Sequence, residues 1–231
     1  LEINMLVSDK IYALLCAFFS VIIIVGNLVY QKFVALPLFP FHTFELSAGA
    51  VLYPLTFLLT DLITEFYGKE RANFCVKVGM IMNILVALII IFIDHLTTTS
   101  WSKIDHATFH SVFGLFGVAY GGSILACYVA QRLDIVIYSW LRRLTKDRFL
   151  WIRSNGSTAL SLLVDTSIVI SFLVVFKILP AEHMSALIVN SYAYKLFFTL
   201  LSTPLFYLSV SVLKRCLNSK NDVSKEMIIA R

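Results

Sequence analysis

Charged residues are scarce in this sequence. Asp, Glu, Lys and Arg make up 14% of the 231 residues, whereas soluble proteins average about 25%. Hydrophobic residues make up 59%, and the mean hydropathy is +0.84. So little charge cannot cover the surface of a soluble domain, and the apolar residues are grouped into long blocks. The sequence therefore predicts an integral membrane protein.

Motifs that mark soluble enzymes and metal sites are also missing. The sequence contains no H-E-x-x-H or G-x-S-x-G segment, and Gly68-Lys69 lacks the upstream glycine of a phosphate-binding loop. The four cysteines have no C-x-x-C spacing, and the five histidines fall outside the apolar blocks. The net charge of +5 comes from basic residues at the ends of these blocks, which argues against nucleic-acid binding. We expect no cofactor, no metal and no enzymatic activity.

Six apolar segments are long enough to cross a bilayer, which takes about 20 residues. They cover residues 11–30, 46–66, 74–94, 119–140, 157–179 and 189–213. The first is too long for the core of a signal peptide and lacks a clean cleavage site. The second contains Pro54 and could be kinked or broken, and the short apolar segment 108–118 is expected at the interface or as an extension of the fourth span. The short connections predict one membrane domain over residues 1–231.

Lysine and arginine are unevenly distributed between the connections. Thirteen of them fall in the two terminal segments and in residues 67–73 and 141–156, against two, Lys32 and Lys103, in the other connections. Positive residues concentrate on the cytoplasmic side of membrane proteins. The sequence therefore predicts an all-α, polytopic protein with six transmembrane helices and both ends in the cytoplasm, located in the inner (cytoplasmic) membrane.

The second span contains acidic side chains, which cost roughly 2.5–3.5 kcal/mol each at the centre of a membrane helix. Asp61 and Glu65 lie four residues apart on one helical face, in a stripe that begins with Tyr53 and Phe57. The adjacent stripe consists of Thr56, Thr60 and Thr64. No basic residue lies within reach of Asp61 on its own helix, so a binding role is favoured for this acid.

Polar residues recur in later spans. The fourth span contains Gln131 and Asp134, and the fifth runs from Asn155-Gly156-Ser157 to Ser161 and Asp165. With the predicted orientation, the acids of the second, fourth and fifth spans all lie in the cytoplasmic half of the bilayer. This common depth predicts one polar site between the helices.

Structural roles are the alternatives for several of these side chains. Asp134 could pair with one of the arginines close to it in the sequence, and Glu65 with Lys69 or Arg71. Lys195 in the sixth span is expected to extend to the membrane interface.

Three segments together resemble a known family. They are PLTFLLTDLITEFYGKERA (54–72), QRLDIVIYSWLRR (131–143) and LWIRSNGSTALSLLVDT (150–166). They are similar to the queuosine-precursor transporter family, also called the vitamin uptake transporter family, and the resemblance covers roughly residues 46–210. It implies import of 7-deazaguanine compounds (preQ0, preQ1 or queuine) for tRNA modification. The residues that match the motifs are Asp61, Glu65, Tyr67, Gly68, Arg71, Gln131, Asp134, Arg153, Asn155, Gly156, Ser157 and Asp165.

The residue chemistry agrees with such a ligand. A 7-deazaguanine presents adjacent N1–H and N2–H donors, which a carboxylate can accept together, so Asp61 or Glu65 is expected at this edge. Its O6 needs a donor such as Asn155 or Gln131. Asp165 is expected to bind the cationic amine of preQ1 or queuine. The flat face of the base calls for an aromatic ring, and the candidates are Tyr53, Phe57 and Trp151.

The way in which transport is driven is left open by the sequence. A carboxylate that takes up a proton could couple import to the proton gradient, or the chain could facilitate diffusion. It could also be the substrate-binding subunit of an energy-coupling-factor importer with a partner ATPase. As a separate point, the spacing of Gly117 and Gly121 would allow a homodimer contact. An intramembrane enzyme with Asp61 and Asp165 as a catalytic pair is the alternative from a different class.

Overall fold

The computed structural model describes residues 7–30, 32–39, 42–114, 118–177 and 180–229. Helices dominate this part of the chain, and a two-stranded sheet joins the first two of them. In chain order the elements are α1 (Val7–Leu28), β1 (Phe33–Phe39), β2 (His42–Ser47), α2 (Ala48–Asp94), α3 (His106–Phe113), α4 (Val118–Leu144), α5 (Leu150–Val175), η1 (Ala181–His183), α6 (Met184–Leu201) and α7 (Thr203–Ile229).

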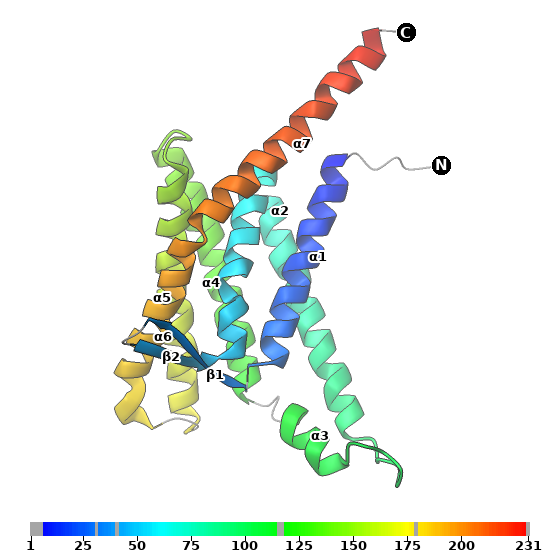
Figure 1. The fold of residues 1–231 in the computed structure, drawn as a ribbon, viewed down its shortest axis with the longest axis vertical. Coiled ribbons are helices and arrows are strands. Elements are labelled where there is room, and N and C mark those ends of the chain that lie inside the picture. Colours follow the sequence, from blue (N-terminus) through cyan, green and yellow to red (C-terminus); the bar gives the residue numbers. More distant parts are fainter. Residues whose placement is uncertain (1–6, 31, 40–41, 115–117, 178–179, 230–231) are drawn as a thin grey trace.

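Five helices in the described ranges are long and apolar enough to cross a membrane, which makes the chain a multi-pass membrane protein. These are α1, α2, α4 from Tyr120, α5 and α6. The 47-residue α2 is longer than one crossing needs, and its backbone leaves the helical conformation at Gly68 (φ 82°, ψ 171°). Figure 1 shows that α2 reverses direction there, so that its two arms run antiparallel. The arms correspond to the predicted spans 46–66 and 74–94.

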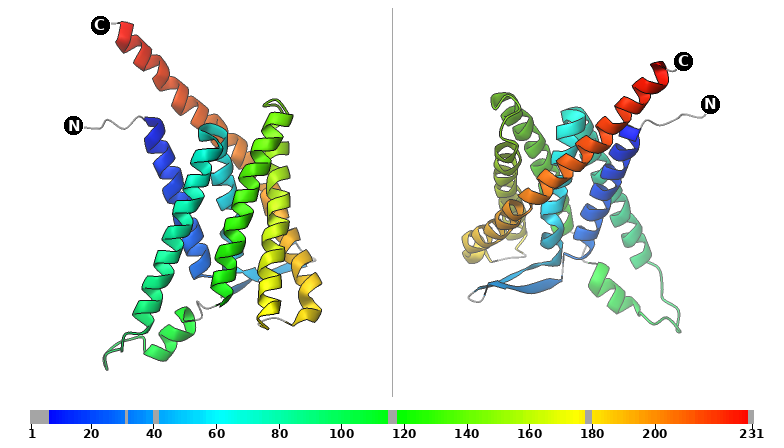
Figure 2. Two further views of the ribbon diagram at one scale, coloured as in Figure 1. Left: turned by 180° about the vertical axis from the view of Figure 1, so that it is seen from behind. Right: turned by 45° about the horizontal axis from the view of Figure 1, so that its top comes forward.

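The helix ends are sorted between two ends of the bundle. The start of α1, the Gly68 turn, the 145–149 connection and the end of α7 lie at one end (Figures 1 and 2). The β1–β2 hairpin, α3, the end of α5 and the start of α6 lie at the other end. The described parts of the four segments rich in lysine and arginine, which the sequence predicts on one side of the membrane, therefore lie at one end of the bundle.

The first two helices pack closely. α1 contacts the first arm of α2 at Gly49, where an added Cβ atom would lie 2.2 Å from the carbonyl oxygen of Gly26. Its Phe19 is fully buried and contacts the second arm at Gly79. Since Gly49 lacks a side chain, the two backbones can approach this closely. This packing fixes the face of α2 that carries the acidic residues.

Several predicted boundaries change. The predicted helix over 157–179 begins seven residues earlier, at Leu150, so that Arg153 to Gly156 are helical. Pro54 lies inside α2 with no break in the helical dihedral angles, because the only non-helical residue inside this helix is Gly68. Residues 106–113 form the separate short helix α3 rather than an extension of α4. Residues 115–117 lie outside the described part, and so does the predicted dimer contact at Gly117.

The prediction of one helix over 189–213 is wrong. α6 ends at Leu201, and α7 begins at Thr203, with Ser202 as a turn between them. Pro204, the second residue of α7, has no backbone N–H to continue the hydrogen-bond ladder of α6. Interrupted helices in membrane proteins are tolerated where polar groups or a cavity satisfy the exposed backbone.

The β1–β2 hairpin is the departure from the predicted all-α fold. The strands are antiparallel and begin with the pair Phe33 and Ser47. Their register shifts between Leu36 and Phe39, where Pro37 cannot donate to the ladder. The side chain of Ser47 then caps α2 by accepting a 3.2 Å hydrogen bond from the backbone of Gly49.

Candidate functional site

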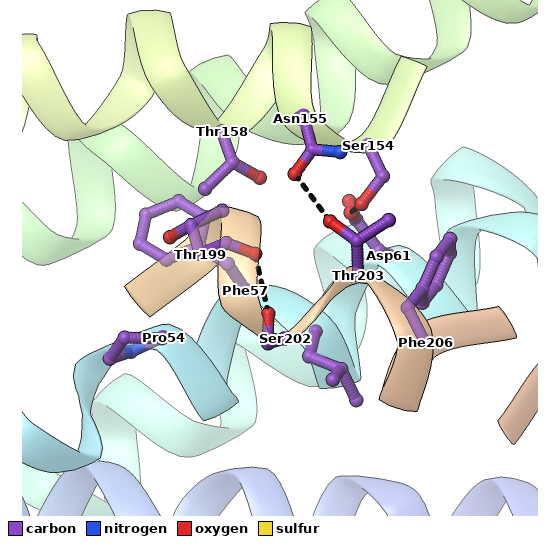
Figure 3. Close-up of a pocket in the computed structure, with 11 residues that line it drawn as sticks. Pro54, Phe57, Asp61, Ser154, Asn155, Thr158, Thr199, Ser202, Thr203 and Phe206 are labelled. Carbon is purple, nitrogen blue, oxygen red and sulfur yellow. Dashed lines mark hydrogen bonds between the residues drawn. The ribbon is translucent and has the colours of Figure 1, made fainter. Parts of the chain in front are cut away.

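A small cavity lies between α2, α5 and the α6–α7 junction (Figure 3). Its volume is about 10 Å³, enough for about one water molecule. Small-molecule sites usually measure roughly 300–1,000 Å³, so the cavity is closed in this conformation. It is lined by Pro54, Phe57, Leu58, Asp61, Ser154, Asn155, Thr158, Thr199, Ser202, Thr203 and Phe206.

Asp61 is the acidic residue of this cavity. Its side chain is buried, and the hydroxyl of Ser154 on α5 donates a hydrogen bond to its Oδ2 atom. Its Oδ1 atom is buried and has no hydrogen-bond partner among the residues that the structure describes. A buried carboxylate oxygen without a donor is costly, so Oδ1 needs a donor from a ligand or from the neighbouring Asp134 carboxyl in its protonated form.

Asp134 on α4 lies behind Asp61 and does not line the cavity. Its Oδ1 atom accepts a 3.3 Å hydrogen bond from Thr158, and the carboxyl group of Asp61 and the hydroxyl groups of Ser157 and Ser161 lie close to the Asp134 carboxyl. The carboxyl groups of Asp61 and Asp134 are close enough to interact electrostatically. No ion pair within the described residues includes either acid, so the expected alternative of an arginine partner for Asp134 is wrong.

Asp165 forms a second polar cluster, with Lys195 of α6 and Tyr53 of α2. Lys195 donates a 2.8 Å hydrogen bond to Oδ2 of Asp165, and the hydroxyl of Tyr53 donates to Oδ1. Only 12% of the Lys195 side chain is exposed, so the expectation that it extends to the interface is wrong. Asp165 thus has a cationic partner within the protein and both of its oxygens occupied.

Glu65 forms a third cluster, with Arg153 rather than Lys69 or Arg71. Arg153 Nη2 donates a 2.6 Å hydrogen bond to Oε1, and Tyr138 of α4 donates a 2.8 Å hydrogen bond to Oε2. All acceptor oxygens of this acid therefore have partners. The sequence predicts Glu65 in the ligand site, and in this conformation Glu65 forms an ion pair with Arg153, with Arg142 Nη1 3.8 Å from Oε2.

Gln131 is buried between α2 and α4 with both ends of its amide group occupied. Thr60 donates a 2.9 Å hydrogen bond to Oε1, and Nε2 donates a 3.0 Å hydrogen bond to Thr56. The threonine stripe of α2 therefore faces Gln131. Gln131 does not line the cavity, so in this conformation its amide group does not face the place proposed for the O6 atom of a ligand.

The motif residues around the Gly68 turn connect α2 to α1. Tyr67 donates a 2.9 Å hydrogen bond to the carbonyl oxygen of Ser8, and Arg71 forms a 3.2 Å ion pair with Asp9. The Arg71 guanidinium also lies 5.8 Å from the centre of the Tyr67 ring. These contacts are structural, because they lie at the end of the bundle and away from the cavity.

The other motif residues lie on α5. Ser157 donates a 3.1 Å hydrogen bond to the carbonyl oxygen of Ser154, and an added Cβ atom at Gly156 would lie 3.3 Å from Leu141 of α4. Asn155 faces the cavity and accepts a 3.1 Å hydrogen bond from Thr203 of α7 (Figure 3). This bond connects α5 to the first turn of α7 across the cavity.

Trp151 is half exposed and lies outside the cavity. It lines an open groove of about 470 Å³ between the start of α5 and α7, together with Glu65, Arg153 and Tyr207. Asp147 also lines the groove, and its hydrogen bond with Arg142 holds the pKa of Asp147 below its usual range. Of the predicted aromatic rings, the buried Phe57 lines the cavity, and Tyr53 packs against it with 5.5 Å between ring centres.

Some cavity residues were not predicted. Ser154 and Thr158 share a face of α5 with Ser161 and Asp165, at spacings of four, three and four residues, so a polar stripe was present in the sequence. Thr203 and Phe206 carry no such signal, because their position depends on the interruption after α6. No group of three or more His, Cys, Asp or Glu side chains that could hold a metal occurs in the described ranges.

A bundle of apolar helices with a polar cavity, acids inside the bundle and an interrupted helix beside them has the architecture of a membrane transport protein. The family model described as "Putative vitamin uptake transporter" matches residues 47–209. The chain belongs to this family, which confirms the resemblance found in the sequence. Its members are transporters rather than enzymes.

Three curated relatives carry related names. "Probable queuosine precursor transporter" of Bacillus subtilis (strain 168) is 32% identical over 70% of this chain and 70% of its own length. The protein of that name from Haemophilus influenzae (strain ATCC 51907 / DSM 11121 / KW20 / Rd) is 27% identical over 77% and 72%. "Queuosine precursor transporter" of Escherichia coli (strain K12) is 26% identical over 80% of each chain. No solved structure matches the chain significantly.

Proposed function

We propose that this chain imports queuosine precursors, the 7-deazaguanine bases preQ0, preQ1 or queuine, for insertion into tRNA. The names of the three relatives support this substrate class. The observation that carries the proposal is the buried Asp61 in the cavity wall, with one carboxylate oxygen unpaired. Among the acids of the described residues, Asp61 alone has an unpaired carboxylate oxygen and also lines the cavity.

Asp61 is suited to the guanine edge of the base. A carboxylate that accepts N1–H and N2–H together forms a bidentate pair, and the unpaired Oδ1 atom supplies an acceptor for it. Asn155 carries an amide group at the opposite wall and can donate to O6. The rings of Phe57 and Phe206 line the same cavity and offer faces for stacking. Glu65 and Asp165 then stabilise the helices around the site through their ion pairs with Arg153 and Lys195.

We place the chain in the inner (cytoplasmic) membrane as a single transport domain with six crossings and both ends in the cytoplasm. The two arms of α2 supply two of the crossings, and α6 with the first turns of α7 supplies the last. Both termini would then lie on the side that carries the basic Arg142, Arg143 and Lys214. Labelling of cysteines introduced at either end would test this orientation.

The closed cavity requires a conformational change for a base to enter. α7 makes few contacts with α2, and the Thr203–Asn155 hydrogen bond is one of the contacts that must break. The groove of about 470 Å³ has the size of a ligand site and lies about one helical turn from the cavity along α2, from Asp61 to Glu65. We propose that the base leaves through this groove toward the cytoplasm, past Trp151 and Arg153.

Transport against a gradient needs coupling to an energy source. The neighbouring acids Asp61 and Asp134 form the place where an ion can be exchanged, and a proton is the simplest ion that can neutralise one of them. The alternatives are facilitated diffusion with trapping in tRNA, or a partner ATPase. Copurification of an ATPase with the chain would favour the last alternative. We further propose that any homodimer uses the exposed face of α4 at Gly121.

Uptake into cells that cannot make queuosine and lack their own importer tests the proposal. These cells would express the chain and receive preQ0, preQ1 or queuine at low concentration, and the modified base would be measured in their tRNA. We expect at least one of the bases to restore the modification. If none does, while the protein is present in the membrane, the proposed substrate class is wrong.

A matched pair of variants tests the site. Asp61→Asn removes the charge that accepts the guanine edge, and we expect it to abolish uptake while the protein is still inserted. Asp105→Asn is the control, because Asp105 caps α3 at the other end of the bundle and asparagine caps helices equally well. Equal uptake by both variants would remove Asp61 from the site.

A further inference from the structure

The open groove between the start of α5 and α7 lies at a helix N-terminus that has no side-chain cap. Leu150, Trp151 and Arg153 at the start of α5 line this groove, and so does Phe149, the N-cap residue. No side chain accepts a hydrogen bond from this N-terminus, and its first turn contains no acid. The first backbone N–H groups of a helix have no acceptor within the helix and attract anions. The groove therefore has one feature of an anion site.

Arg153 gives an independent indication of an anion. It lines the groove and is 3% exposed. Its Nη2 atom donates to Glu65, and Nε donates a 3.4 Å hydrogen bond to the hydroxyl of Tyr138, whereas the buried Nη1 atom has no partner within the described ranges. A buried charged donor without an acceptor is costly. An acceptor placed in the groove would complete the hydrogen bonding of Arg153.

The other charges of the groove also favour a negative ligand. Its two acids are already paired, Glu65 with Arg153 and Asp147 with Arg142, each at 2.6 Å. Lys214 of α7 is exposed and forms no ion pair with any residue that the structure describes. The acids of the groove are thus neutralised, while its cations still have donors to offer.

The side chains around the groove place it at the level of the lipid headgroups. The exposed large apolar residues of α7 end at Val212, and exposed basic residues follow at Lys214 and Arg215. Two half-exposed aromatic rings, those of Trp151 and Tyr207, line the same groove. Trp and Tyr concentrate where membrane helices leave the hydrocarbon region, and basic pockets between helices bind lipid headgroups there. The anion that fits this position is therefore the phosphate group of a phospholipid.

We propose that this groove binds the headgroup of an anionic phospholipid such as phosphatidylglycerol. The phosphate group accepts hydrogen bonds from Arg153 and from the first N–H groups of α5, and Lys214 supplies a second cation. The acyl chains lie along the exposed apolar side chains of α7, which include Leu205 and Leu208. With the orientation proposed above, this lipid belongs to the cytoplasmic leaflet. A base that leaves through the groove then has to displace the headgroup.

Native mass spectrometry of the purified full chain in detergent tests the lipid site. The protein would be titrated with phosphatidylglycerol and, separately, with phosphatidylcholine of the same acyl chains, because choline cancels the charge of the same phosphate group. We expect one phosphatidylglycerol to bind at least about tenfold more tightly than phosphatidylcholine, since each nearby Lys or Arg adds affinity for an anionic headgroup. Inorganic phosphate at the same concentration should not displace it, because it lacks acyl chains.

Lys214→Gln and Arg215→Gln form a matched pair of variants. Both residues are exposed and adjacent on α7, but only Lys214 lines the groove. We expect Lys214→Gln to weaken phosphatidylglycerol binding about fivefold, and Arg215→Gln to weaken it by less than about twofold. Because both side chains are exposed, both variants should fold, whereas a substitution of Arg153 would also break its ion pair with Glu65.

Ser211 provides a second matched pair. It is exposed on α7 and lines the groove, so Ser211→Asp adds a negative charge there and Ser211→Asn adds a neutral group of similar size. We expect Ser211→Asp to abolish the preference for phosphatidylglycerol over phosphatidylcholine, because its charge repels the phosphate group. Ser211→Asn should keep most of this preference.

Three outcomes would overturn the lipid site. Equal binding of the two phospholipids would show that the chain has no preference for an anionic headgroup. Equal losses in Lys214→Gln and Arg215→Gln would show that the lipid responds to surface charge in general rather than to the groove. Displacement of the lipid by inorganic phosphate would identify a site for a free anion. No base is added in these measurements, so their result is independent of the proposed transport function.

Discussion

Arg153 and Glu65 form a buried ion pair between α5 and the first arm of α2, with 2.6 Å between Nη2 and Oε1. Arg153 is 3% exposed, and its Nη1 atom has no hydrogen-bond partner in the described part of the chain. The pair lies about one helical turn from Asp61 along α2, and both of its residues line the open groove but not the closed cavity. A change to the Arg153–Glu65 ion pair is therefore expected to affect both the stability of the protein and transport.

Removal of one partner of this pair should be strongly destabilising. Arg153→Met leaves the buried Glu65 carboxylate with only the more distant Arg142, whose Nη1 atom lies 3.8 Å from Oε2, so the loss approaches the about 3–5 kcal/mol expected for breaking a buried pair. Glu65→Gln combined with Arg153→Met removes both charges, and we expect it to recover most of the lost stability. Thermal unfolding in detergent measures the three variants. A double variant no more stable than Arg153→Met would show that the ion pair is not what holds these helices together.

Much of this arrangement was predictable from the sequence. Long apolar blocks identified the membrane helices, and the rarity of acids inside such blocks marked Asp61, Asp134 and Asp165 as residues with a specific role. The structure does bring these acids into adjacent helices. Periodicity also placed Phe57 on the same face of α2 as Asp61, where both line the cavity.

The sequence did not predict how the charges are paired. Ion pairs between helices depend on the rotation and depth of each helix, and a boundary error of a few residues changes both. The predicted start of the fifth span at 157 put Arg153 in a connection, whereas it lies within α5 and reaches Glu65. The interruption at Ser202 was missed for a similar reason, since its residues are apolar enough to continue a helix.

Asp165 should not decide between charged and neutral substrates. Lys195 and Tyr53 occupy both of its oxygens, so the amine of preQ1 finds no free acid there. We expect Asp165→Asn to reduce uptake of preQ1 and preQ0 by similar factors, because it leaves Lys195 unpaired and loosens α6. Competitive uptake of the two bases measures the ratio. A selective loss of preQ1 transport would mean that the amine displaces Lys195 from Asp165.

The 2-amino group of the base should be a strong requirement. If Asp61 accepts N1–H and N2–H together, a base without the 2-amino group leaves a buried acceptor unpaired. We expect 7-deazahypoxanthine to compete at least about 100-fold more weakly than 7-deazaguanine, and adenine to compete poorly. Inhibition of labelled preQ1 uptake measures these affinities. Equal competition by the two deazapurines would contradict the bidentate pair at Asp61.

Gly68 should be intolerant of any side chain although it has open space around it. No atom lies within 4 Å of an added Cβ atom, so a substitution meets no steric contact outside its own backbone. Its φ of 82° and ψ of 171° belong to a region that only glycine adopts readily, and other residues pay about 1–3 kcal/mol there. We expect Gly68→Ala to lower the Tm. Gly68→Asn should give no rescue, because asparagine tolerates positive φ mainly at ψ near 50°.

Gly121 provides the matched control for this turn. It also has no atom within 4 Å of an added Cβ atom, but it lies inside α4, where alanine stabilises a helix by up to about 1 kcal/mol relative to glycine. Thermal unfolding should therefore show opposite signs for Gly68→Ala and Gly121→Ala. The turn sets the angle between the two arms of α2, and the first arm carries Asp61, so Gly68→Ala should also reduce uptake. A Gly68→Ala variant with unchanged Tm and uptake would show that the arms do not need this backbone conformation.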